Sequence, residues 1–554
     1  MFYILIKCLK ILKGGINLKK VLSFMMILVL ALGTLAGCGG GADQAGAAKN
    51  TIKYNIGADP KTLDPALNAE VQGSTILANC YEGLMRLDEN NKAIPGMAEK
   101  VDISDDQLTY TFHLRDANWS DGQKVTAQDF EYSWKRALDP KTAADYAYQL
   151  YYIKNGQAFS GNKASIDDVA VKATDDKTLQ VTLVSATPYF LELTAFPTYF
   201  PVRKDIVEKN PEAWPINPEN VPFNGPFKMT KWQRGDVVEI VKNDKYYDSD
   251  RVKVDSVEFT MITEDTTAFQ AFQSGEIDGS DGVSEAQIPQ LREKNDPNFK
   301  IHPYIGIYYY SLNVTQEPTD NPKVREALSL AVDRNLITTV VVKAGQKSAK
   351  TFVPEGMSGA DGKDFTENAK DYGIKPEAQV EKAQKLLAEA GYPNGEGFPE
   401  ITVYYNTNES HKALAEAVQE MWKQNLNIDV KLQNQEWKVF QETRNQGNFK
   451  IARDGWIGDY LDPMTFLDMF LSTSGNNHSQ WKNPEFDKLI TDIKKTQDLE
   501  KRDKMLHQAE DMIMDENIVI PIYYYTNPEI LKENIKNVRV SPFGQVYFDN
   551  ANID

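Results

Sequence analysis

The sequence predicts an α/β protein whose mixed sheets are flanked by helices and spread over more than one hydrophobic core. Segments that alternate apolar and polar residues with a period of two are interspersed with segments of helical periodicity. The 554 residues are enough for several domains, and contents of 41% hydrophobic and 25% charged residues are typical of a globular protein. Strands that alternate with helices favour sheets covered by helices on their faces.

The first expected strand follows the alternation of Ile52, Tyr54 and Ile56, and Thr109–Leu114 shows the same period. Ile307–Asn313 is a tyrosine-rich strand, and Ile518–Tyr525 is a nearly continuous apolar run close to the end of the chain. The other expected strands are Thr178–Leu183, Val237–Lys242, Val254–Met261, Glu400–Tyr405, Asp429–Asn434 and Lys450–Ile457. Helical segments separate these strands, so we expect more than one sheet.

Several helices show their boundaries in the sequence. Thr126 is a suitable N-cap for a helix that ends at Leu138, and Asp129 is favourable in its first turn. Gly275 ends a helix over Asp265–Ser274. The remaining expected helices are Ser74–Leu84, Val324–Val332, Val380–Ala390, Leu414–Leu426, Pro484–Thr496 and Leu499–Asp515.

The beginning of the chain has the pattern of a secretion signal. Two lysines precede the apolar run Val21–Leu32, and Leu35-Ala36-Gly37-Cys38 follows it. The tetrapeptide resembles the lipobox of bacterial lipoproteins, which implies a signal peptide over 1–37 and a diacylglycerol on Cys38. A transmembrane anchor is the alternative, but this run is too short to cross about 30 Å of hydrocarbon. Residues 38–50 then form the lipidated cysteine and a flexible tether, and 1–17 fit the signal poorly, so we hypothesise that translation starts at Leu18.

Charge and cysteine content narrow the possible partners. Removal of 1–37, which carry five lysines and no acid, changes the formal net charge from −18 to −23. This charge disfavours nucleic acid and anionic lipid as partners, because binding to either needs basic patches. Cys80 would be the only cysteine besides the lipidated Cys38, so we expect no disulfide within the mature chain. We interpret Cys80 as a small core residue rather than as a nucleophile.

The sequence lacks the common signatures of catalysis and cofactor binding. Its five histidines are scattered, with no HExxH motif and no pair at metal-ligand spacing. It contains no GxSxG, Walker A or GxGxxG motif. We therefore expect no catalytic residues, no metal site and no cofactor.

One long block of sequence resembles a known family of binding proteins. The block combines Met97–Lys100, Leu108–Arg115, Asn118–Gly122 and Val125–Trp134, and it closely resembles the signature of the peptide/nickel-type solute-binding proteins of ABC importers. The resemblance continues in order over the rest of the chain at Gly275–Asp278, Val324–Leu328, Ala331–Arg334, Ala388–Tyr392 and Phe486–Ile490. These segments indicate the fold rather than the ligand.

The resemblance implies a two-lobed, hinged periplasmic-binding-protein fold of type II, from the large cluster with an extra subdomain. Lobe I is expected over 51–81, 204–305 and 527–554, the extra subdomain over 82–203 and lobe II over 306–526. The two crossings between the lobes, near Ile305 and Thr526, would be the hinge. Ligand contacts to both lobes would then favour the closed form.

A second set of segments resembles the oligopeptide-binding branch of this family. The set comprises Tyr404–Thr407, His411–Lys412, Asn434–Lys438, Thr443–Gly447 and Arg453–Tyr460. The branch holds an extended peptide between its lobes and pairs the peptide main chain with protein backbone. The chain departs from its relatives at Gly279–Gly282, where they have tyrosine and asparagines, and at Gly306 and Ile457, where some have a cysteine pair.

The resemblance implies that Asp459 pairs with the peptide ammonium. The alternative is that Asp459 is a turn residue that caps the next helix. Gly455 and Ile457, with Trp456 between them, and Val71 would offer main-chain groups; a β-bulge is the alternative for Gly455. Trp437 and Tyr146 would flank the first ligand side chains, or pack in the core. Arg453, Arg444 and His411 are candidates for pairing with ligand carboxylates, or else form surface charges or internal ion pairs, and Asn406 would hold a pocket water or a loop.

We therefore expect a monomeric, extracytoplasmic oligopeptide receptor that is not an enzyme. A lipid on Cys38 would anchor it to the outer face of the bacterial cell membrane, on the periplasmic side in a Gram-negative cell. Its partners would be an oligopeptide and the permease and ATPase subunits of an ABC transporter, with no nucleic acid. The alternatives are a dipeptide-, nickel- or haem-binding relative, a receptor for signal peptides, and a secreted hydrolase.

Overall fold

The computed structural model describes residues 50–554, except 90, 212 and 219–220. The predicted signal peptide, Cys38 and all of the tether before Asn50 lie outside the described residues. Within the described part, no helix is long and apolar enough to cross a membrane.

The main feature of the described part is an 11-stranded sheet in the order β15-β14-β16-β12-β17-β11-β1-β10-β9-β8, with β13 paired to β17. The sheet is mixed, as predicted, because β1 runs parallel to β10 and β11 whereas β12 runs antiparallel to β16 and β17. Its strands are β1 Thr51–Asn55, β8 Phe227–Gln233, β9 Val237–Lys242, β10 Ser256–Thr260, β11 Gly279–Asp281, β12 Phe299–Leu312, β13 Lys347–Ser348, β14 Ile401–Asn406, β15 Val430–Gln435, β16 Ile451–Ile457 and β17 Val519–Leu531.

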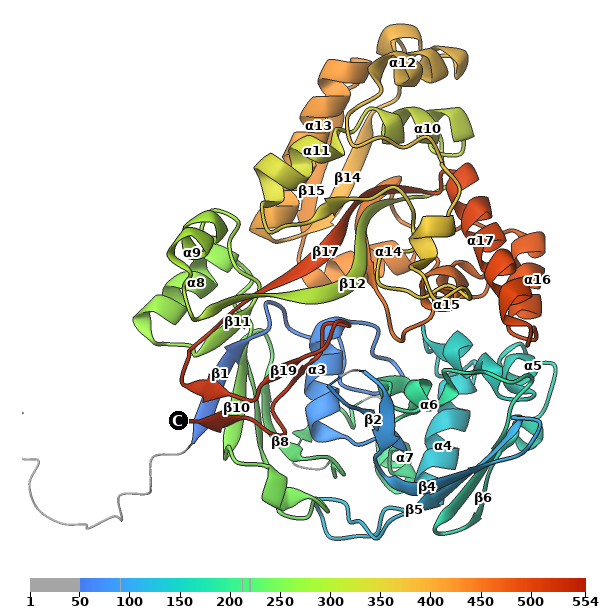
Figure 1. The fold of residues 1–554 in the computed structure, drawn as a ribbon, viewed down its shortest axis with the longest axis vertical. Helices are drawn as coiled ribbons and strands as arrows, with labels where there is room; N and C mark the ends of the chain where they lie inside the picture. Colours follow the sequence, from blue (N-terminus) through green and yellow to red (C-terminus); the bar gives the residue numbers. More distant parts are fainter. Residues whose placement is uncertain (1–49, 90, 212, 219–220) are drawn as a thin grey trace, which may run out of the picture. The chain divides into compact units, whose positions relative to one another are not determined.

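Two long strands, β12 and β17, connect the two halves of this sheet. They run side by side across the middle of Figure 1, from the group of α10 to α15 toward β11 and β1. Their antiparallel register shifts between the Pro303–Thr526 pair and the Ile307–Tyr524 pair. A second shift follows between the Tyr308–Tyr523 and Tyr309–Pro521 pairs, so the regular ladder is interrupted at two places along the two strands.

A separate four-stranded antiparallel sheet has the order β4-β5-β7-β6 and packs against α4. It consists of β4 Ala98–Ile103, β5 Thr109–Leu114, β6 Val171–Asp175 and β7 Thr178–Thr182. Two-stranded pairs are formed by β2 Met85–Leu87 with β3 Ala93–Pro95, β18 Ile535–Lys536 with β21 Asn552–Ile553, and β19 Arg539–Val540 with β20 Val546–Tyr547.

The helices show the caps that their sequences predict. In α4, the side chains and backbone of Thr126 and Asp129 form a capping box, and α8 ends at Gly275 with a φ of 81°. The α-helices are α3 Val71–Cys80, α4 Ala127–Leu138, α5 Gly156–Ser160, α6 Phe190–Leu193, α7 Lys204–Lys209, α8 Asp265–Ser274, α9 Ile288–Lys294, α10 Pro322–Leu330, α11 Arg334–Leu336, α12 Val380–Glu389, α13 Glu409–Leu426, α14 Trp437–Asn445, α15 Met464–Leu467, α16 Pro484–Ile493 and α17 Leu499–Asp515. Shorter helical turns are η2 Ala147–Tyr152, η3 Ile166–Asp168, η4 Pro197–Tyr199, η6 Ser249–Arg251, η7 Ile337–Val342, η8 Phe365–Asn368, η9 Pro393–Gly395 and η10 Asp468–Phe470.

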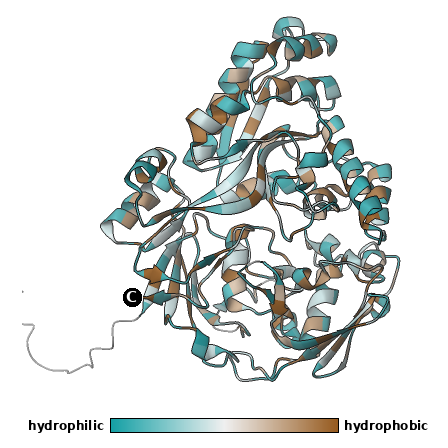
Figure 2. Cartoon of the chain, in the orientation of Figure 1, coloured by the Kyte–Doolittle hydropathy of each residue, from teal (hydrophilic) through white to brown (hydrophobic). Residues whose placement is uncertain are grey.

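The prediction of more than one hydrophobic core is confirmed. Tyr308, Leu328 and Trp422 belong to a core where α10 and α13 pack near β12 and β17, and Ile52 and Phe112 belong to another. Figure 2 shows polar and apolar segments along the same helices, as expected for helices that bury one face. Cys80 is buried, and this burial raises the pKa of its thiol well above the usual range. Its predicted role as a core residue is confirmed.

Several predicted boundaries were wrong. The helix expected at Ser74–Leu84 is α3, which begins at Val71 and ends at Cys80. The strands expected at 307–313 and 518–525 are much longer, because β12 begins at Phe299 and β17 continues to Leu531. Both extensions contain proline and polar residues, which weaken the sequence pattern of a strand. They are nevertheless strands, because they pair with each other at Pro303–Thr526 and Ile301–Pro528.

Candidate functional site

A cavity of about 610 Å³ brings together residues from distant parts of the chain. Its lining comes from the β1–α3 segment, the turn before η2, the loops around α8 and β11, the β14–α13 junction, α14, β16 and the 523–528 stretch of β17. All eleven predicted ligand-binding residues line it: Val71, Tyr146, Asn406, His411, Trp437, Arg444, Arg453, Gly455, Trp456, Ile457 and Asp459. Their roles in binding stay predictions.

One edge of β16 is open where it lines the cavity. The strand pairs with β12 from Gly306–Ile457 to Leu312–Ile451, but it pairs with β14 only at Ile451 and Ala452. Among the described strands, residues 453–457 therefore have a neighbour on one edge only. An extended peptide in the cavity has access to the backbone groups of this edge.

Gly455 allows close packing at the same edge. A Cβ atom at this position would lie 2.5 Å from the hydroxyl oxygen of Tyr525, which is closer than carbon and oxygen atoms can approach. The regular pairing of Gly455 with Tyr308 shows no bulge here, so the β-bulge alternative was wrong. Glycine is required because Tyr525 occupies the space that a side chain would fill.

Asp459 follows β16 and presents a carboxylate that lacks a cationic partner. It accepts hydrogen bonds from Gln149 Nε2 at 2.7 Å, Tyr146 Oη at 3.3 Å and Thr465 Oγ1 at 3.4 Å. No described lysine, arginine or histidine lies within 4.0 Å of it. Burial, reinforced by the nearby Asp468 carboxylate, raises the pKa of Asp459 well above its usual range.

The alternative role of Asp459 as a helix cap was wrong. The N-cap of α15 is Pro463, and the Met464 amide in its first turn donates to the Asp462 carboxylate at 3.0 Å and not to Asp459. Asp459 instead places its own amide 2.9 Å from Thr465 Oγ1, an interaction that holds the loop after β16. The Asp459 carboxylate accepts hydrogen bonds only from the uncharged side chains of Tyr146, Gln149 and Thr465.

The predicted aromatic residues combine packing with exposure to the cavity. The ring of Tyr146 lies 5.9 Å from that of Trp456 and 5.1 Å from that of Phe196, so these residues form an aromatic wall. Trp437 is the first residue of α14 and donates a hydrogen bond from its indole nitrogen to Glu70. Val71 begins α3 directly after Glu70.

The three candidate cations differ in their availability to a ligand. Arg444 is buried in an ion pair with Asp454, and His478 Nδ1 lies 2.7 Å from the same carboxylate, so the internal ion-pair interpretation applies to Arg444. Burial, with Arg453 nearby, lowers the pKa of His411 well below its usual range, which makes its imidazole neutral. Only Arg453 remains as an available cation of the three.

Arg453 is held by aromatic residues and not by an acid. Its guanidinium lies 5.0 Å from the Tyr308 ring centroid and donates a hydrogen bond to Tyr525 Oη at 2.9 Å. Its Nε atom is buried without a hydrogen-bond partner, as are His411 Nδ1 and Asn406 Oδ1 in the described structure. A carboxylate in the cavity would give this cation the partner that it lacks.

The sequence interpretation missed an acidic part of the cavity wall. Asp265, Asp281 and Glu285 line it, and burial together with neighbouring carboxylates raises the pKa of Asp265 and of Asp281 to about 7. Asp281 lies in Gly279–Gly282, where the sequence departs from its relatives, but no sequence motif indicates a ligand role for these acids. Within the described residues, no group of three or more His, Cys, Asp or Glu side chains is arranged to hold a metal ion.

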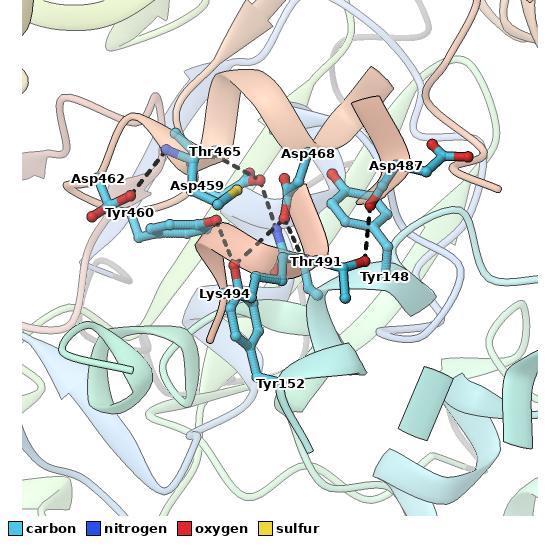
Figure 3. A network of polar contacts seen from close by, with 12 residues as sticks. Tyr148, Tyr152, Asp459, Tyr460, Asp462, Thr465, Asp468, Asp487, Thr491 and Lys494 are labelled. Carbon is cyan, nitrogen blue, oxygen red and sulfur yellow. Dashed lines mark hydrogen bonds and ion pairs between the residues drawn. The ribbon is translucent and has the colours of Figure 1, made fainter. Parts of the chain in front are cut away.

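Beside Asp459 lies a buried polar network between the 146–189 region and the 460–502 region. Figure 3 shows Tyr152 pointing toward Tyr460 and Lys494, with Asp468 next to Lys494. The Tyr152 hydroxyl lies 3.4 Å from the Tyr460 hydroxyl, and the Lys494 Nζ lies 4.4 Å from the Tyr152 ring centroid. The rings of Tyr189 and Tyr460 stack with centroids 4.7 Å apart.

A large mixed-sheet α/β protein with a cavity between two groups of elements joined by two crossing strands has the organisation of a two-lobed solute-binding protein. The profile described as bacterial extracellular solute-binding proteins, family 5 middle, matches residues 92–478. The chain belongs to this family of extracellular solute-binding proteins, which are binding proteins rather than enzymes.

Individual relatives cover nearly the whole chain. The chain is 40% identical to the oligopeptide-binding protein OppA of Bacillus subtilis over 543 residues. This alignment covers 96% of this chain and 98% of that protein. The crystal structure of Haemophilus influenzae OppA in complex with RPPGFSPFR matches with a TM-score of 0.86 and 34% identity, over 92% of this chain and 99% of that one. The predicted two-lobed, hinged fold is confirmed by these structures.

The comparisons also distinguish two arrangements of one relative. The structure of the Escherichia coli murein tripeptide binding protein MppA matches with a TM-score of 0.85, at 34% identity over 92% of this chain and 99% of that one. The unliganded open form of MppA, at 33% identity over 92% and 98%, gives a TM-score of only 0.60. The described chain therefore differs from that open form in the arrangement of its parts.

Proposed function

We propose that this protein is an extracytoplasmic receptor that binds extended oligopeptides between two lobes and delivers them to an ABC permease. The observation that carries the proposal is the Asp459 carboxylate, which lines the cavity and lacks a cationic partner among the described residues. A peptide ammonium would supply that partner, and the charge pair would offset the desolvation of both groups.

The peptide main chain would pair with the open edge of β16. The Gly455 carbonyl and the Ile457 backbone would pair with peptide main-chain groups, whereas the Gly455 amide donates to Asp454 Oδ1 at 2.9 Å. Main-chain groups are the same for every peptide sequence, so this mode of binding suits a receptor of broad specificity. Val71 would contribute from the opposite wall, and Trp437 and Tyr146 would border the first ligand side chains. The far carboxylate of the ligand, or an acidic side chain, would pair with Arg453.

We propose the lobe boundaries on the same basis, with lobe I over 51–81, 204–305 and 527–554, the extra subdomain over 82–203 and lobe II over 306–526. The hinge would lie near Ile305 and Thr526. The register shift of β12 against β17 supports this position, because it separates the Pro303–Thr526 pair from the Ile307–Tyr524 pair. A short irregular stretch in two long paired strands can absorb the rotation of one lobe against the other.

The protein would remain at the outer face of the cell membrane through a lipid on Cys38, and it would act as a monomer. The lipid would keep the receptor close to the permease and ATPase subunits. This part of the proposal is supported by the lipobox-like sequence at residues 35–38. The dipeptide, nickel and haem alternatives are not favoured by the oligopeptide-binding relatives, and a signalling role would use the same cavity.

Calorimetry with peptides of three to six alanines, with free and with acetylated N-termini, tests the proposal. Asp459→Ala should weaken binding of the free peptides at least tenfold, because a buried ammonium would lose its counter-charge. Acetylated peptides should bind poorly to the wild type. Asp105→Ala, in the exposed turn between β4 and β5, is the matched control and should bind as the wild type does. Equal affinities for free and acetylated peptides would refute the amine anchor.

A further inference from the structure

Arg444 and Asp454 form an ion pair inside the wall of the cavity. Arg444 comes from the last turn of α14 and Asp454 from β16, and both residues line the cavity. Arg444 Nη1 donates to Asp454 Oδ1, and the two side chains are 6% and 2% exposed. The Nη2 atom of the same guanidinium donates to Gln441 Oε1 at 2.6 Å. The positive charge of Arg444 is therefore compensated from within the protein.

The Asp454 carboxylate is held by three donors. Besides Arg444, the amide of Gly455 donates to Oδ1 at 2.9 Å, and His478 Nδ1 lies 2.7 Å from Oδ2. Because an ionised carboxylate only accepts hydrogen bonds, His478 Nδ1 is the donor in this contact. Burial alone would raise the pKa of Asp454, but Arg444 and His478 outweigh it and lower the pKa to about 2. Asp454 is therefore a fixed, ionised counter-charge.

Two amide side chains connect this ion pair to two further acids of the cavity wall. Gln441, which accepts from the guanidinium, places its nitrogen 3.5 Å from Glu70 Oε2. Asn445 Oδ1 lies 3.2 Å from His478 Nε2, and its nitrogen donates to Asp145 Oδ2 at 3.4 Å. Glu70 and Asp145 both line the cavity. Each of these acids is thus separated from the ion-pair cluster by one side chain.

Glu70 and Asp145 add negative character to this part of the wall. Within the described residues, no lysine, arginine or histidine side chain lies within 4.0 Å of either carboxylate. Burial raises the pKa of both carboxyl groups. A further negative charge beside them is unfavourable, because like charges brought together in a desolvated site repel each other.

The position of the ion pair indicates a role beyond stability. A buried ion pair is a weak source of stability, because the desolvation of both charges offsets most of their attraction. In the cavity wall, however, an arginine without Asp454 would be a cation next to the ligand, and a ligand carboxylate would be its natural partner. Asp454 takes the place that such a ligand group would occupy.

We propose that Asp454 is a specificity-determining residue: its carboxylate occupies the Arg444 guanidinium and so excludes acidic ligand side chains from this part of the cavity. This inference rests on the proposed function and deepens it, because it states which class of side chain the receptor rejects. The rejection is built from an internal competitor and from nearby acids, and neither penalises a neutral or basic side chain. The terminal carboxylate that we assign to Arg453 is not affected.

The test uses alanine tripeptides in which each position in turn carries glutamate or glutamine, and mature protein freed of copurifying peptide. Calorimetry gives the ratio of the dissociation constants of the glutamate and glutamine peptides. In the wild type, we expect a ratio of at least ten at one position or more. Asp454→Ala should lower that ratio at least tenfold, because the ligand carboxylate enters the vacated place beside Arg444. A wild-type ratio at or below one at every position, or a ratio that Asp454→Ala leaves unchanged, would overturn the inference.

The double variant Asp454→Ala with Arg444→Met tests whether the cation causes the gain. It removes both charges, so the improved binding of the glutamate peptide should disappear. A gain that persists in full would arise from the altered shape of the wall and would overturn the role of the ion pair.

Asp454→Asn serves if the alanine variant does not fold, because the amide keeps the shape of the carboxylate. Its ratio should fall about threefold, since the arginine charge is no longer neutralised but the amide still fills the place beside it. An unchanged ratio in Asp454→Asn would count against the inference in the same way.

Asp64→Ala is the matched control. Asp64 accepts two hydrogen bonds from Arg136, at 2.9 and 2.5 Å, with side chains that are 1% and 14% exposed, and neither residue lines the cavity. The substitution leaves a buried arginine without its counter-charge elsewhere in the chain, so the ratio should stay as in the wild type. A fall equal to that in Asp454→Ala would show a general effect of lost ion pairs and would overturn the inference.

The outcomes separate this inference from the proposed function. If the wild type binds none of the tripeptides, the proposed function is refuted and the inference with it. If the wild type binds the glutamine peptides but does not discriminate against glutamate at any position, only the role of Asp454 is overturned. Discrimination that is lost in Asp454→Ala and restored in the double variant would support both.

Discussion

Asp468 and Lys494 form an ion pair in which the Oδ2 and Nζ atoms are 2.9 Å apart and both side chains are almost fully buried. The pair lies beside Tyr152, which comes from a region more than 300 residues earlier in the chain (Figure 3). Burial raises the pKa of Asp468, and Lys494 opposes this rise. Each of these two buried charges therefore needs the other as its counter-charge.

Removal of one charge should destabilise the protein strongly. We expect Lys494→Met to lower the free energy of unfolding by about 3 kcal/mol, because it leaves the Asp468 carboxylate buried without a counter-charge. Urea unfolding followed by tryptophan fluorescence would measure this change. The double variant Lys494→Met with Asp468→Asn should recover at least half of the loss, and an unchanged stability of the single variant would contradict the prediction.

Arg453 and Arg444 should respond differently to the same substitution. Arg453→Met is expected to weaken binding of peptides with a free C-terminal carboxylate about tenfold, with little loss of stability, because this cation has no carboxylate partner in the described structure. Arg444→Met should instead lower the free energy of unfolding by about 3 kcal/mol, because Asp454 loses its ion pair. Calorimetry with free and C-terminally amidated peptides, together with urea unfolding, distinguishes these effects. Equal behaviour of the two variants would refute the distinction.

Gly455→Ala should disturb the cavity at the open edge of β16. The added methyl group would collide with the Tyr525 hydroxyl, which Arg453 also contacts, so both side chains would have to move. We expect at least a tenfold loss of peptide affinity and a cost of about 2 kcal/mol in stability, as is usual for overpacking. Gly161→Ala is the control, because this exposed residue lies outside the cavity with a φ of −85°, and the closest atom to an added Cβ would be the Gln157 carbonyl oxygen at 3.3 Å. Wild-type affinity in Gly455→Ala would show that Tyr525 moves at no cost.

Much of the fold follows from local signals, whereas the relations between distant segments do not. The capping box of Thr126 and Asp129 and the glycine at 275 fix the bounds of α4 and α8, and the structure confirms both. The first half of β12 and the last part of β17 contain proline and polar residues. These two segments are strands only because they pair with each other. Tertiary pairing thus decided what local propensity did not.

The candidate site shows the same division. Family resemblance was sufficient to predict residues that line one cavity, because motifs mark the segments that carry them. It was not sufficient to separate Arg444 from Arg453, since the partner Asp454 lies ten positions from Arg444 and beside Arg453 in sequence. Gln149 was missed because its contact with Asp459 depends on how the 146–152 turn meets the loop after β16, which no periodicity encodes.

Replacement of Cys38 should release the protein from the membrane. Two acyl chains give stable anchoring at about 0.8 kcal/mol per buried methylene, and the mature sequence after them carries a net negative charge that offers no second attraction to anionic lipid. We expect Cys38→Ser to move the protein from the detergent phase to the aqueous phase in detergent partitioning, and mass spectrometry of the wild type should find the diacylglycerol on Cys38. Cys80→Ser, at a buried position far along the chain, is the control and should stay in the detergent phase.

Because of the acids in the cavity wall, we expect the free energy of unfolding to fall as the pH rises. Burial and the nearby Glu529 carboxylate raise the pKa of Asp281 to about 7, whereas the unfolded chain should show a value of about 3.9. Between these values the folded state holds a proton that the unfolded state has released, so the contribution of Asp281 to stability is full below about pH 4 and is lost as the pH rises through about 7.

Asp281→Asn tests this relation. The substitution removes the charge that the fold disfavours, so it should raise the free energy of unfolding by about 2 kcal/mol at pH 8, with neighbouring acids and partial exposure reducing the full effect of the shift. At pH 5 most of the pKa shift lies above the working pH, so the variant should be stabilised by only about a third of the amount expected at pH 8. Asp105→Asn, in the exposed β4–β5 turn, should show no such difference between the two pH values. A stabilisation by Asp281→Asn that is equal at pH 5 and pH 8 would mean that hydrogen bonding, and not the charge, limits the wild-type residue.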